Sequence, residues 1–268
     1  MLKDITLGQY FPGNSIAHKL DPRTKILLVT LYIIALFSAK GWMGYAVMAV
    51  TLAACVKVSH VGLRALVRGL KPLVFIIAFT GILNMFFTPD THYLWEWGIL
   101  RVSVKGIENA LFMVIRIMLL VMGTFLMTYT TSPIRLTDGL ESLLNPLKKI
   151  HVPVHELAMM MAIALRFIPT LIEETDKIMS AQKARGADFE SGGLFQKAKA
   201  LVPILVPLFI SAFRRADELA TAMECRCYHG GEGRTKLHVL KYQRRDYVAL
   251  TGGVGILALV VVLRRLGA

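Results

Sequence analysis

Cysteine is scarce in this chain, whose 268 residues include only Cys55, Cys225 and Cys227. Three cysteines do not make a disulfide framework, and a Cys-x-Cys pair alone supplies two of the four ligands that a structural zinc site needs. We interpret all three as small residues that pack easily, and we expect no metal site.

A nucleotide-binding motif is also missing. The sequence has no G-x-x-x-x-G-K-[ST] phosphate loop, and GGEGRTK at 230–236 lacks the adjacent Lys-Ser/Thr pair that would hold a nucleotide and its Mg²⁺. We therefore expect no cofactor in this chain, so any ATP and magnesium must be bound by a partner.

Acidic side chains are missing from the interiors of the apolar runs, where a carrier driven by protons or sodium ions would need them. The clear charge inside such a run is Arg116, within MVIRIML. We consider two roles for it: helix packing or anchoring to lipid headgroups, and contact with a second membrane subunit. A self-contained secondary membrane carrier is the less favoured alternative function.

Apolar sequence is plentiful, since 55% of the residues are hydrophobic and the mean hydropathy is +0.55. These residues form blocks separated by basic stretches, which is typical of a membrane protein. The first block begins near Ile26, after a polar segment, so we expect no cleavable signal. The net charge of +13 comes from basic residues beside apolar spans, so nucleic-acid binding is not expected.

Five membrane spans are predicted, at about 24–39, 42–57, 71–87, 107–130 and 246–263. The first three are short against the ~20 helical residues that a ~30 Å hydrocarbon layer requires. Asp21 is a suitable N-cap for the first span, with Pro22 at its first helical position. The segment HYLWEWGILRVSVKG predicts a hairpin bent at Gly98, with Tyr93, Trp95 and Trp97 at the level of the lipid headgroups.

The distribution of basic residues orients these spans. Lys and Arg number 4, 4 and 17 in 1–25, 57–71 and 131–245, but only 1 and 2 in 39–42 and 88–106. The excess of positive charge on cytoplasmic loops places the N-terminus and the long third segment in the cytoplasm.

This orientation gives three parts: the N-terminal segment and four transmembrane helices in 1–130, a cytoplasmic domain in 131–245, and a last transmembrane helix in 246–268. An odd number of spans puts the C-terminus outside, where Arg264 and Arg265 are less favoured.

Two long helices are predicted in the cytoplasmic domain, over about 155–185 and 193–226. Each begins apolar and ends charged, and apolar stretches of about 14 residues are short for crossing a bilayer. We therefore expect the apolar parts to lie against the membrane underside or another membrane subunit, as amphipathic helices do. The helices should be kinked or segmented by Pro169, Pro203 and Pro207. We consider two roles for Arg166: holding the first helix to the membrane underside, and lying on the helix face as a snorkelling residue.

The ends of these two helices form a weak repeat at an offset of 41 residues. Ala184, Arg185 and Gly186 align with Cys225, Arg226 and Cys227. One arginine at a helix end could be only a cap, because cations favour the helix C-terminus and Gly186 suits the position after it. Two copies favour a functional reading, in which small flanks let a partner approach and each guanidinium holds a carboxylate.

Other polar groups give weaker evidence for a functional site. His151 and His155 are spaced like two metal ligands on a helix, but HVPVH contains Pro153 and does not complete H-E-x-x-H, so no metal is expected there. A membrane enzyme using His151, His155 and Cys227 is a second alternative, against which their scatter in the sequence argues.

The two arginine ends, the N-terminal segment GQYFPGNSIAHKLDPRTK and the segment ALRFIPTLIEE together resemble the transmembrane T component of energy-coupling factor (ECF) transporters. The resemblance covers nearly the whole chain. It implies an all-α integral membrane protein with about five transmembrane helices plus a cytoplasmic domain of long amphipathic coupling helices.

The resemblance also implies partners and a mechanism. A T component is not an enzyme; it joins two cytoplasmic ABC-type ATPases, which bind ATP and Mg, to a membrane-embedded substrate-binding S component, one or several in exchange, for uptake of vitamins or transition-metal ions. By motif position, Arg185 and Arg226 would dock in the ATPase grooves, flanked by Ala184, Gly186, Cys225 and Cys227. The apolar parts of the coupling helices would cradle the S component. The candidate contacts with the S component or with the membrane are Arg116, Arg166, Pro169, Pro203 and Pro207.

Overall fold

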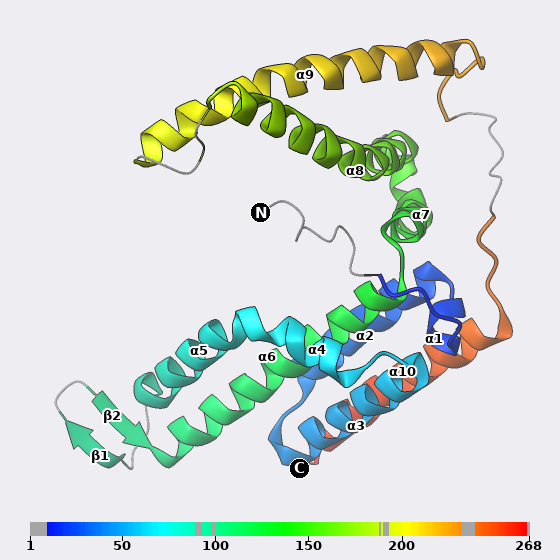
Figure 1. Cartoon of the computed structure of the whole chain (residues 1–268). Helices are drawn as coiled ribbons and strands as arrows, with labels where there is room; N and C mark the ends of the chain where they lie inside the picture. The colour runs from blue at the N-terminus through cyan, green and yellow to red at the C-terminus, as the bar shows by residue number, and fades with distance from the viewer. Residues whose placement is uncertain are drawn as a thin grey trace. The chain divides into compact units, whose positions relative to one another are not determined.

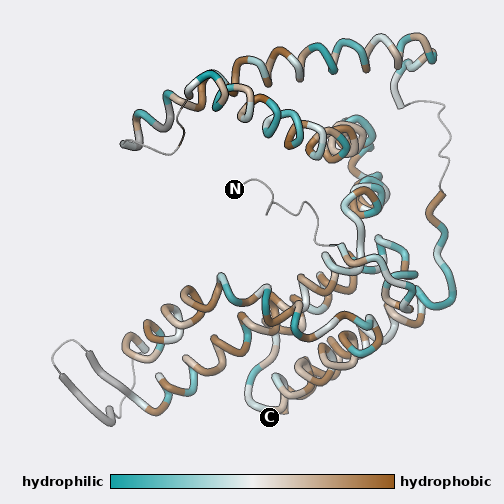
Figure 2. The backbone as a smooth tube through the Cα atoms, in the orientation of Figure 1, coloured by the Kyte–Doolittle hydropathy of each residue, from teal (hydrophilic) through white to brown (hydrophobic). Residues whose placement is uncertain are grey.

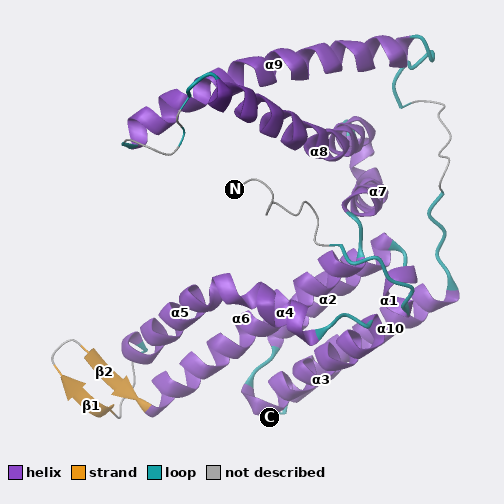
Figure 3. Ribbon diagram, viewed as in Figure 1, coloured by secondary structure: helices purple, strands orange, loops and turns teal. Residues whose placement is uncertain are grey.

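The computed structural model describes residues 10–88, 93–97, 100–187, 189, 193–231 and 239–266. These residues form helices and one small hairpin (Figures 1 and 3). They divide into two compact units. The bundle unit contains the described residues between 10 and 139 together with 240–266, and the arm unit contains those between 140 and 239.

The bundle unit is built from helices whose core lies between α2, α3, α6 and α10. Its elements are α1 (Ile16–Lys19), α2 (Pro22–Ser38), α3 (Gly41–Ser59), α4 (Leu63–Leu70), η2 (Lys71–Leu73), α5 (Val74–Phe87), β1 (Tyr93–Trp97), β2 (Leu100–Ser103), α6 (Val104–Thr130), the first part of α7 (Pro133–Leu144) and α10 (Arg244–Arg265). Leu36, Met48, Leu119 and Val260 are almost fully buried in this core. Large apolar side chains such as Phe75 point outward, at 79% exposure, as expected of helices that face lipid.

The start of α2 is as predicted. Pro22 occupies the first helical position, and the Asp21 carboxylate accepts a hydrogen bond from the Arg23 backbone N–H at 2.9 Å. The carboxylate thus satisfies one of the backbone donors that a helix N-terminus leaves free.

Five helical segments are long and apolar enough to cross a membrane, but they are not the predicted five. They are α3, the continuous stretch Leu63–Phe87, α6, α8 (Val154–Ala184) and α10. Helix α2 has only 17 residues, fewer than the others. Helix α8, which the sequence analysis places outside the membrane, also meets this criterion over its continuous 31 residues, and the criterion rests on length and hydropathy alone.

The predicted hairpin is confirmed. Strands β1 and β2 pair antiparallel, with Trp97 opposite Leu100 and Trp95 opposite Val102. The bend at Gly98 lies outside the described residues, as do the side chains of the strand aromatics.

The arm unit consists of the end of α7, η3 (Asn145–Ile150), α8 and α9 (Leu194–Glu224). Figure 2 shows hydrophobic and hydrophilic residues alternating along α8 and α9, which fits amphipathic helices. Pro169, Pro203 and Pro207 lie inside these helices without dividing them, so of the two predicted effects, a kink or a division, the division is wrong. The Pro203 carbonyl lies four residues before Pro207, which has no N–H to donate, and it accepts a hydrogen bond from the Gln182 side chain instead.

Candidate functional site

The two long helices of the arm unit are joined by a polar clamp. The Glu174 carboxylate accepts a hydrogen bond from the Arg215 guanidinium at 2.8 Å and a second from the Ser211 hydroxyl. Further along α8, the Gln182 amide donates to the Pro203 carbonyl at 3.4 Å, which is earlier in α9. The helices therefore run in opposite directions past each other, and Figure 1 shows α9 returning past the end of α8.

This clamp joins equivalent positions of the repeat, because Glu174 and Arg215 are 41 residues apart, as Arg185 and Arg226 are. Each tip arginine thus lies 11 residues beyond the clamp on its own helix, about 16 Å at 1.5 Å per residue. Since the helices run in opposite directions, the tips project to opposite sides of the clamp. Such an arrangement suits two separate receptors better than one site shared by both arginines.

The first tip is a helix end of the Schellman type. The Ala187 N–H donates to the Gln182 carbonyl and the Gly186 N–H donates to the Lys183 carbonyl, both at 3.0 Å. Gly186 has φ of +87°, the left-handed conformation that this ending requires and that glycine adopts without steric cost. Arg185 is therefore the last residue of the helical turn.

The second tip ends in the same way. The Tyr228 N–H donates to the Met223 carbonyl at 3.1 Å, and the Cys227 N–H donates to the Glu224 carbonyl at 2.8 Å. Cys227 has φ of +56° and takes the position that Gly186 has in the first tip. The two tips therefore share one helix ending, and in the second tip a cysteine is held in the left-handed conformation that glycine adopts in the first.

Replacing Cys227 by glycine is expected to stabilise this ending. Left-handed backbone costs a residue with a Cβ ~1–2 kcal/mol, and the greater freedom of glycine in the unfolded chain offsets ~0.5–1 kcal/mol of the gain. Hydrogen exchange of the Cys227 and Tyr228 amides should therefore slow several-fold. Cys225→Gly is the matched control, since Cys225 has φ of −61° and glycine there should speed exchange. Equal effects of the two substitutions would contradict the strain at Cys227.

Both tips present an arginine between small, exposed residues. Arg185, Arg226 and their four predicted flanks are all exposed, namely Ala184, Gly186, Cys225 and Cys227. Across the part of the chain that the structure describes, neither guanidinium has a hydrogen bond or ion pair. A Cβ built on Gly186 would meet nothing within 4 Å. Each tip is thus a projecting cation with open space around it, suited to a bidentate hold on a carboxylate of another molecule.

The other predicted site residues are spread over both units. Arg166 and Pro169 are exposed on α8, and Pro203 is exposed on α9 with Pro207 half-buried. Arg116 lies in α6 of the bundle unit, where its Nε and Nη2 donate to the Tyr45 hydroxyl at 2.9 and 2.5 Å. Its guanidinium also lies 5.8 Å from the centre of the Phe37 ring, so Arg116 has a helix-packing role within the bundle.

The histidines take structural positions. His151 ends η3 with φ of +61°, and His155 Nδ1 lies 3.0 Å from the Glu141 carboxylate. A Cβ on Gly231 would lie 2.6 Å from the His155 ring, so the chain after the second tip packs against the start of α8. Within the described residues, no group of three or more His, Cys, Asp or Glu side chains could hold a metal ion.

Exposed apolar side chains cover the start of α8 and the middle of α9. On α8 and α9 they include Leu157, Met160, Met161, Leu201, Val202, Leu205, Val206, Phe209, Ile210 and Phe213. An exposed apolar surface of this length is typical of an interface with lipid or with another membrane protein.

Sequence reasoning missed the clamp between the arms. Nothing in the sequence analysis pairs Glu174 with Arg215, as the structure does. Opposite charges at equivalent positions of the 41-residue repeat were the available signal.

Comparison with known proteins identifies the family. Residues 13–237 match the model of the CbiQ family, described as cobalt transport protein. Three similar proteins are energy-coupling factor transporter transmembrane proteins (EcfT), from Ruminiclostridium cellulolyticum, Clostridium kluyveri and Bacillus subtilis. The first is 54% identical over 252 residues, with 94% of each chain covered. The second is 57% identical over 250 residues, with 93% of each covered, and the third 46% over 264 residues, with 98% of this chain and all of the relative covered. The chain therefore belongs to the CbiQ family, as a transmembrane T component of energy-coupling factor transporters.

Proposed function

We propose that this T component transmits the energy of ATP hydrolysis from two cytoplasmic ABC-type ATPases to a membrane-embedded substrate-binding S component. The observation that carries the proposal is the pair of exposed arginines, Arg185 and Arg226, at identical helix endings on opposite sides of one clamp. Each guanidinium docks in a groove of one ATPase and pairs with a carboxylate there. The small flanking residues allow the groove walls to approach the helix end closely.

The exposed apolar parts of α8 and α9 form the surface that holds the S component. Their exposed side chains include Met160 and Met161, and methionine adapts to surfaces of different shape. Such a surface suits one T component that serves several S components in exchange. The cargo is a vitamin or a transition-metal ion, recognised by the S component rather than by this chain.

The arms move as one piece when the ATPases close. The Glu174–Arg215 clamp joins the two helices directly, and the packing of Gly231 on His155 holds the chain that follows α9 against the start of α8. Closure of the ATPase pair would therefore shift both tips together and carry the apolar surface with them. This motion tilts the S component so that its binding site opens to the cytoplasm. In this arrangement the arm unit lies in the cytoplasm, as the distribution of Lys and Arg also favours.

Copurification tests the proposal. The wild-type chain, purified from membranes in which a candidate pair of ABC ATPases is produced, should retain both ATPases. The variant with both Arg185→Ala and Arg226→Ala should lose them while staying folded. If the wild type retains no ATPase, or the double variant retains as much as the wild type, the arginines are only helix ends and the proposed function fails.

A further inference from the structure

The first turn of α2 contacts more of the chain than helix capping requires. Within the described residues, the chain passes between the arm unit and the bundle unit at two places, one inside α7 after Gly139 and one in the loop before Leu240. The bundle-side residues of both connections lie against the segment from Asp21 to Lys25. These five residues belong to the N-terminal segment that carries the resemblance to the family, and helix capping accounts only for Asp21 and Pro22.

The connection through α7 packs on this turn without spare room. A Cβ built on Gly139 would lie 3.0 Å from the Pro22 Cβ and 3.3 Å from the Arg23 backbone N. Just before α7, the Lys25 ammonium group donates to the Thr130 carbonyl at 2.8 Å and to the Thr131 hydroxyl at 3.1 Å. The end of α6 and the start of α7 are therefore both fixed to α2.

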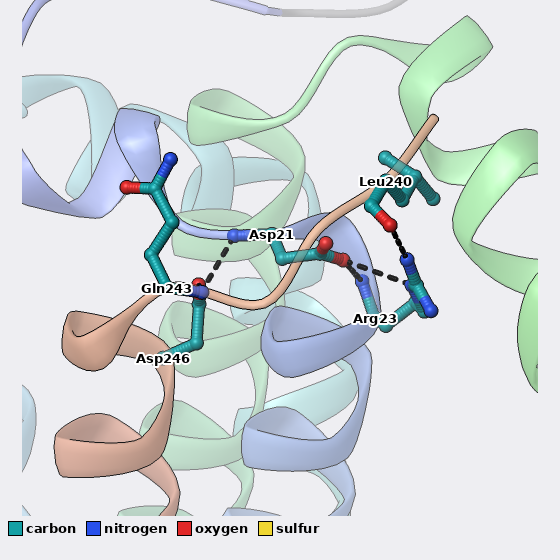
Figure 4. A network of polar contacts seen from close by, with 5 residues as sticks. All are labelled: Asp21, Arg23, Leu240, Gln243 and Asp246. Atoms are coloured by element: carbon teal, nitrogen blue, oxygen red, sulfur yellow. Dashed lines mark hydrogen bonds and ion pairs between the residues drawn. The ribbon is translucent and has the colours of Figure 1, made fainter. Parts of the chain in front are cut away.

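The second connection is fixed by Arg23. Its Nη2 donates to the Leu240 carbonyl at 2.6 Å, and its guanidinium lies 4.6 Å from the centre of the Tyr242 ring. Figure 4 shows the guanidinium reaching the returning chain at Leu240, while the Asp246 carboxylate approaches the Asp21 backbone. That carboxylate accepts from the Asp21 N–H at 2.9 Å. The start of α10 is thus fixed to the same turn.

The contacts are also shielded from water. Asp21, Lys25 and Asp246 are exposed by only 8, 7 and 1%. Buried hydrogen bonds to charged groups are strong and geometrically defined, because breaking them leaves a charge without a partner. Neither connection can therefore shift relative to α2 without a large loss of interaction energy.

We propose that the turn from Asp21 to Lys25 is an anchor that fixes both connections of the arm unit to the membrane bundle. Arg23 and Lys25 are positioning residues for energy coupling. The inference rests on the proposed function, in which the ATPases move the arms. With both connections fixed to α2, the bundle stays a firm base against which the arms act on the S component. If the contacts with α2 were broken, the ATPases would still bind the arginine tips and hydrolyse ATP. The two connections would then flex, and the movement of the ATPases would not reach the S component.

The test uses the complete complex of this chain, two ATPases and an S component, reconstituted in lipid vesicles. ATP hydrolysis and uptake of a radiolabelled probe are measured together, with Co²⁺ or riboflavin chosen according to the S component that copurifies. Arg23→Ala and Lys25→Met should lower uptake per ATP hydrolysed at least tenfold, with the amount of bound ATPase and the hydrolysis rate within twofold of wild type. Arg23→Lys keeps one donor for the Leu240 carbonyl and should recover part of the ratio.

Matched controls separate this role from folding. Arg245→Ala removes an exposed arginine whose described hydrogen bonds go to the Gln243 side chain, and it should leave the ratio unchanged. Gly139→Ala should lower the ratio by pushing α7 from Pro22, whereas Gly252→Ala in α10, where a Cβ meets nothing within 4 Å, should not.

Two results would overturn the inference: an unchanged ratio in Arg23→Ala, Lys25→Met and Gly139→Ala, or a loss of uptake and hydrolysis in parallel with the amount of folded complex. Failure of the wild-type chain to retain the ATPases would instead remove the proposed function itself.

Discussion

Arg185→Ala and Arg226→Ala are each expected to weaken ATPase binding by a similar factor, and their combination is expected to abolish it. Removing one partner of a buried interfacial charge pair typically costs ~2–5 kcal/mol, because the other charge is left buried and unpaired. Each single substitution should therefore raise the dissociation constant at least about 30-fold. The physical reason is the same at both sites, since the two tips share one helix ending and one pattern of exposure.

The two effects should add. Each tip lies about 16 Å from the clamp on opposite sides of it, and substitutions so far apart with no shared partner are usually additive within ~0.5 kcal/mol. Titration of purified ATPase onto the detergent-solubilised chain would measure the three dissociation constants. Arg→Lys at each tip should raise the dissociation constant less than Arg→Ala does, because an ammonium group keeps the charge but not the two parallel donors of a guanidinium.

Arg214→Ala provides the control for charge alone. Arg214 is an exposed arginine of α9 that lies twelve residues before the second tip. Its removal changes the net charge as Arg226→Ala does, but it should change the dissociation constant less than about threefold, as expected of an exposed charge. If Arg214→Ala weakened ATPase binding as much as Arg226→Ala, the effect would come from the overall positive charge. If the effects of Arg185→Ala and Arg226→Ala were strongly non-additive, both tips would bind one receptor.

The arginine tips could be predicted from sequence because their signal is local. A small residue on each side of an arginine, at the end of a helix that turns from apolar to charged, occurs twice at one offset. The conformation of the second tip could not be predicted by the rule that glycine follows a helix end. Cys227 adopts φ of +56° because the hydrogen bonds to the Met223 and Glu224 carbonyls require it, whatever the side chain.

Long-range contacts had no such signal. The sequence predicts that Asp21 caps α2, since the capped backbone N–H is two residues away. It does not predict that Asp246, 225 residues further on, accepts a hydrogen bond from the Asp21 backbone. The hydrophobic pattern identifies apolar segments, but which helices pack together is decided by the tertiary fold.

Asp246→Ala is expected to destabilise the bundle unit strongly. The Asp246 carboxylate is 1% exposed and accepts from two backbone donors, the Asp21 N–H at 2.9 Å and the Gln243 N–H at 2.8 Å. Alanine removes the acceptor of both donors, and the Asp21 N–H then stays buried without a partner, which costs ~1–3 kcal/mol. A carboxylate in the first turn of α10 also interacts favourably with the helix dipole. The total loss should be about 2–5 kcal/mol.

Thermal unfolding in detergent would measure this loss, as a decrease of the midpoint on the order of 10 °C. The unfolding midpoint of Asp246→Asn should lie between those of Asp246→Ala and the wild type. The amide oxygen of asparagine accepts from one backbone donor, while its NH₂ group faces the other donor and cannot accept from it. Arg244→Ala, at an exposed position in the same helical turn, should change the midpoint by no more than about 2 °C. Because Asp246 joins the starts of α2 and α10, a normal midpoint in Asp246→Ala would mean that the packing of Val260 and its neighbours alone holds α10 in the bundle.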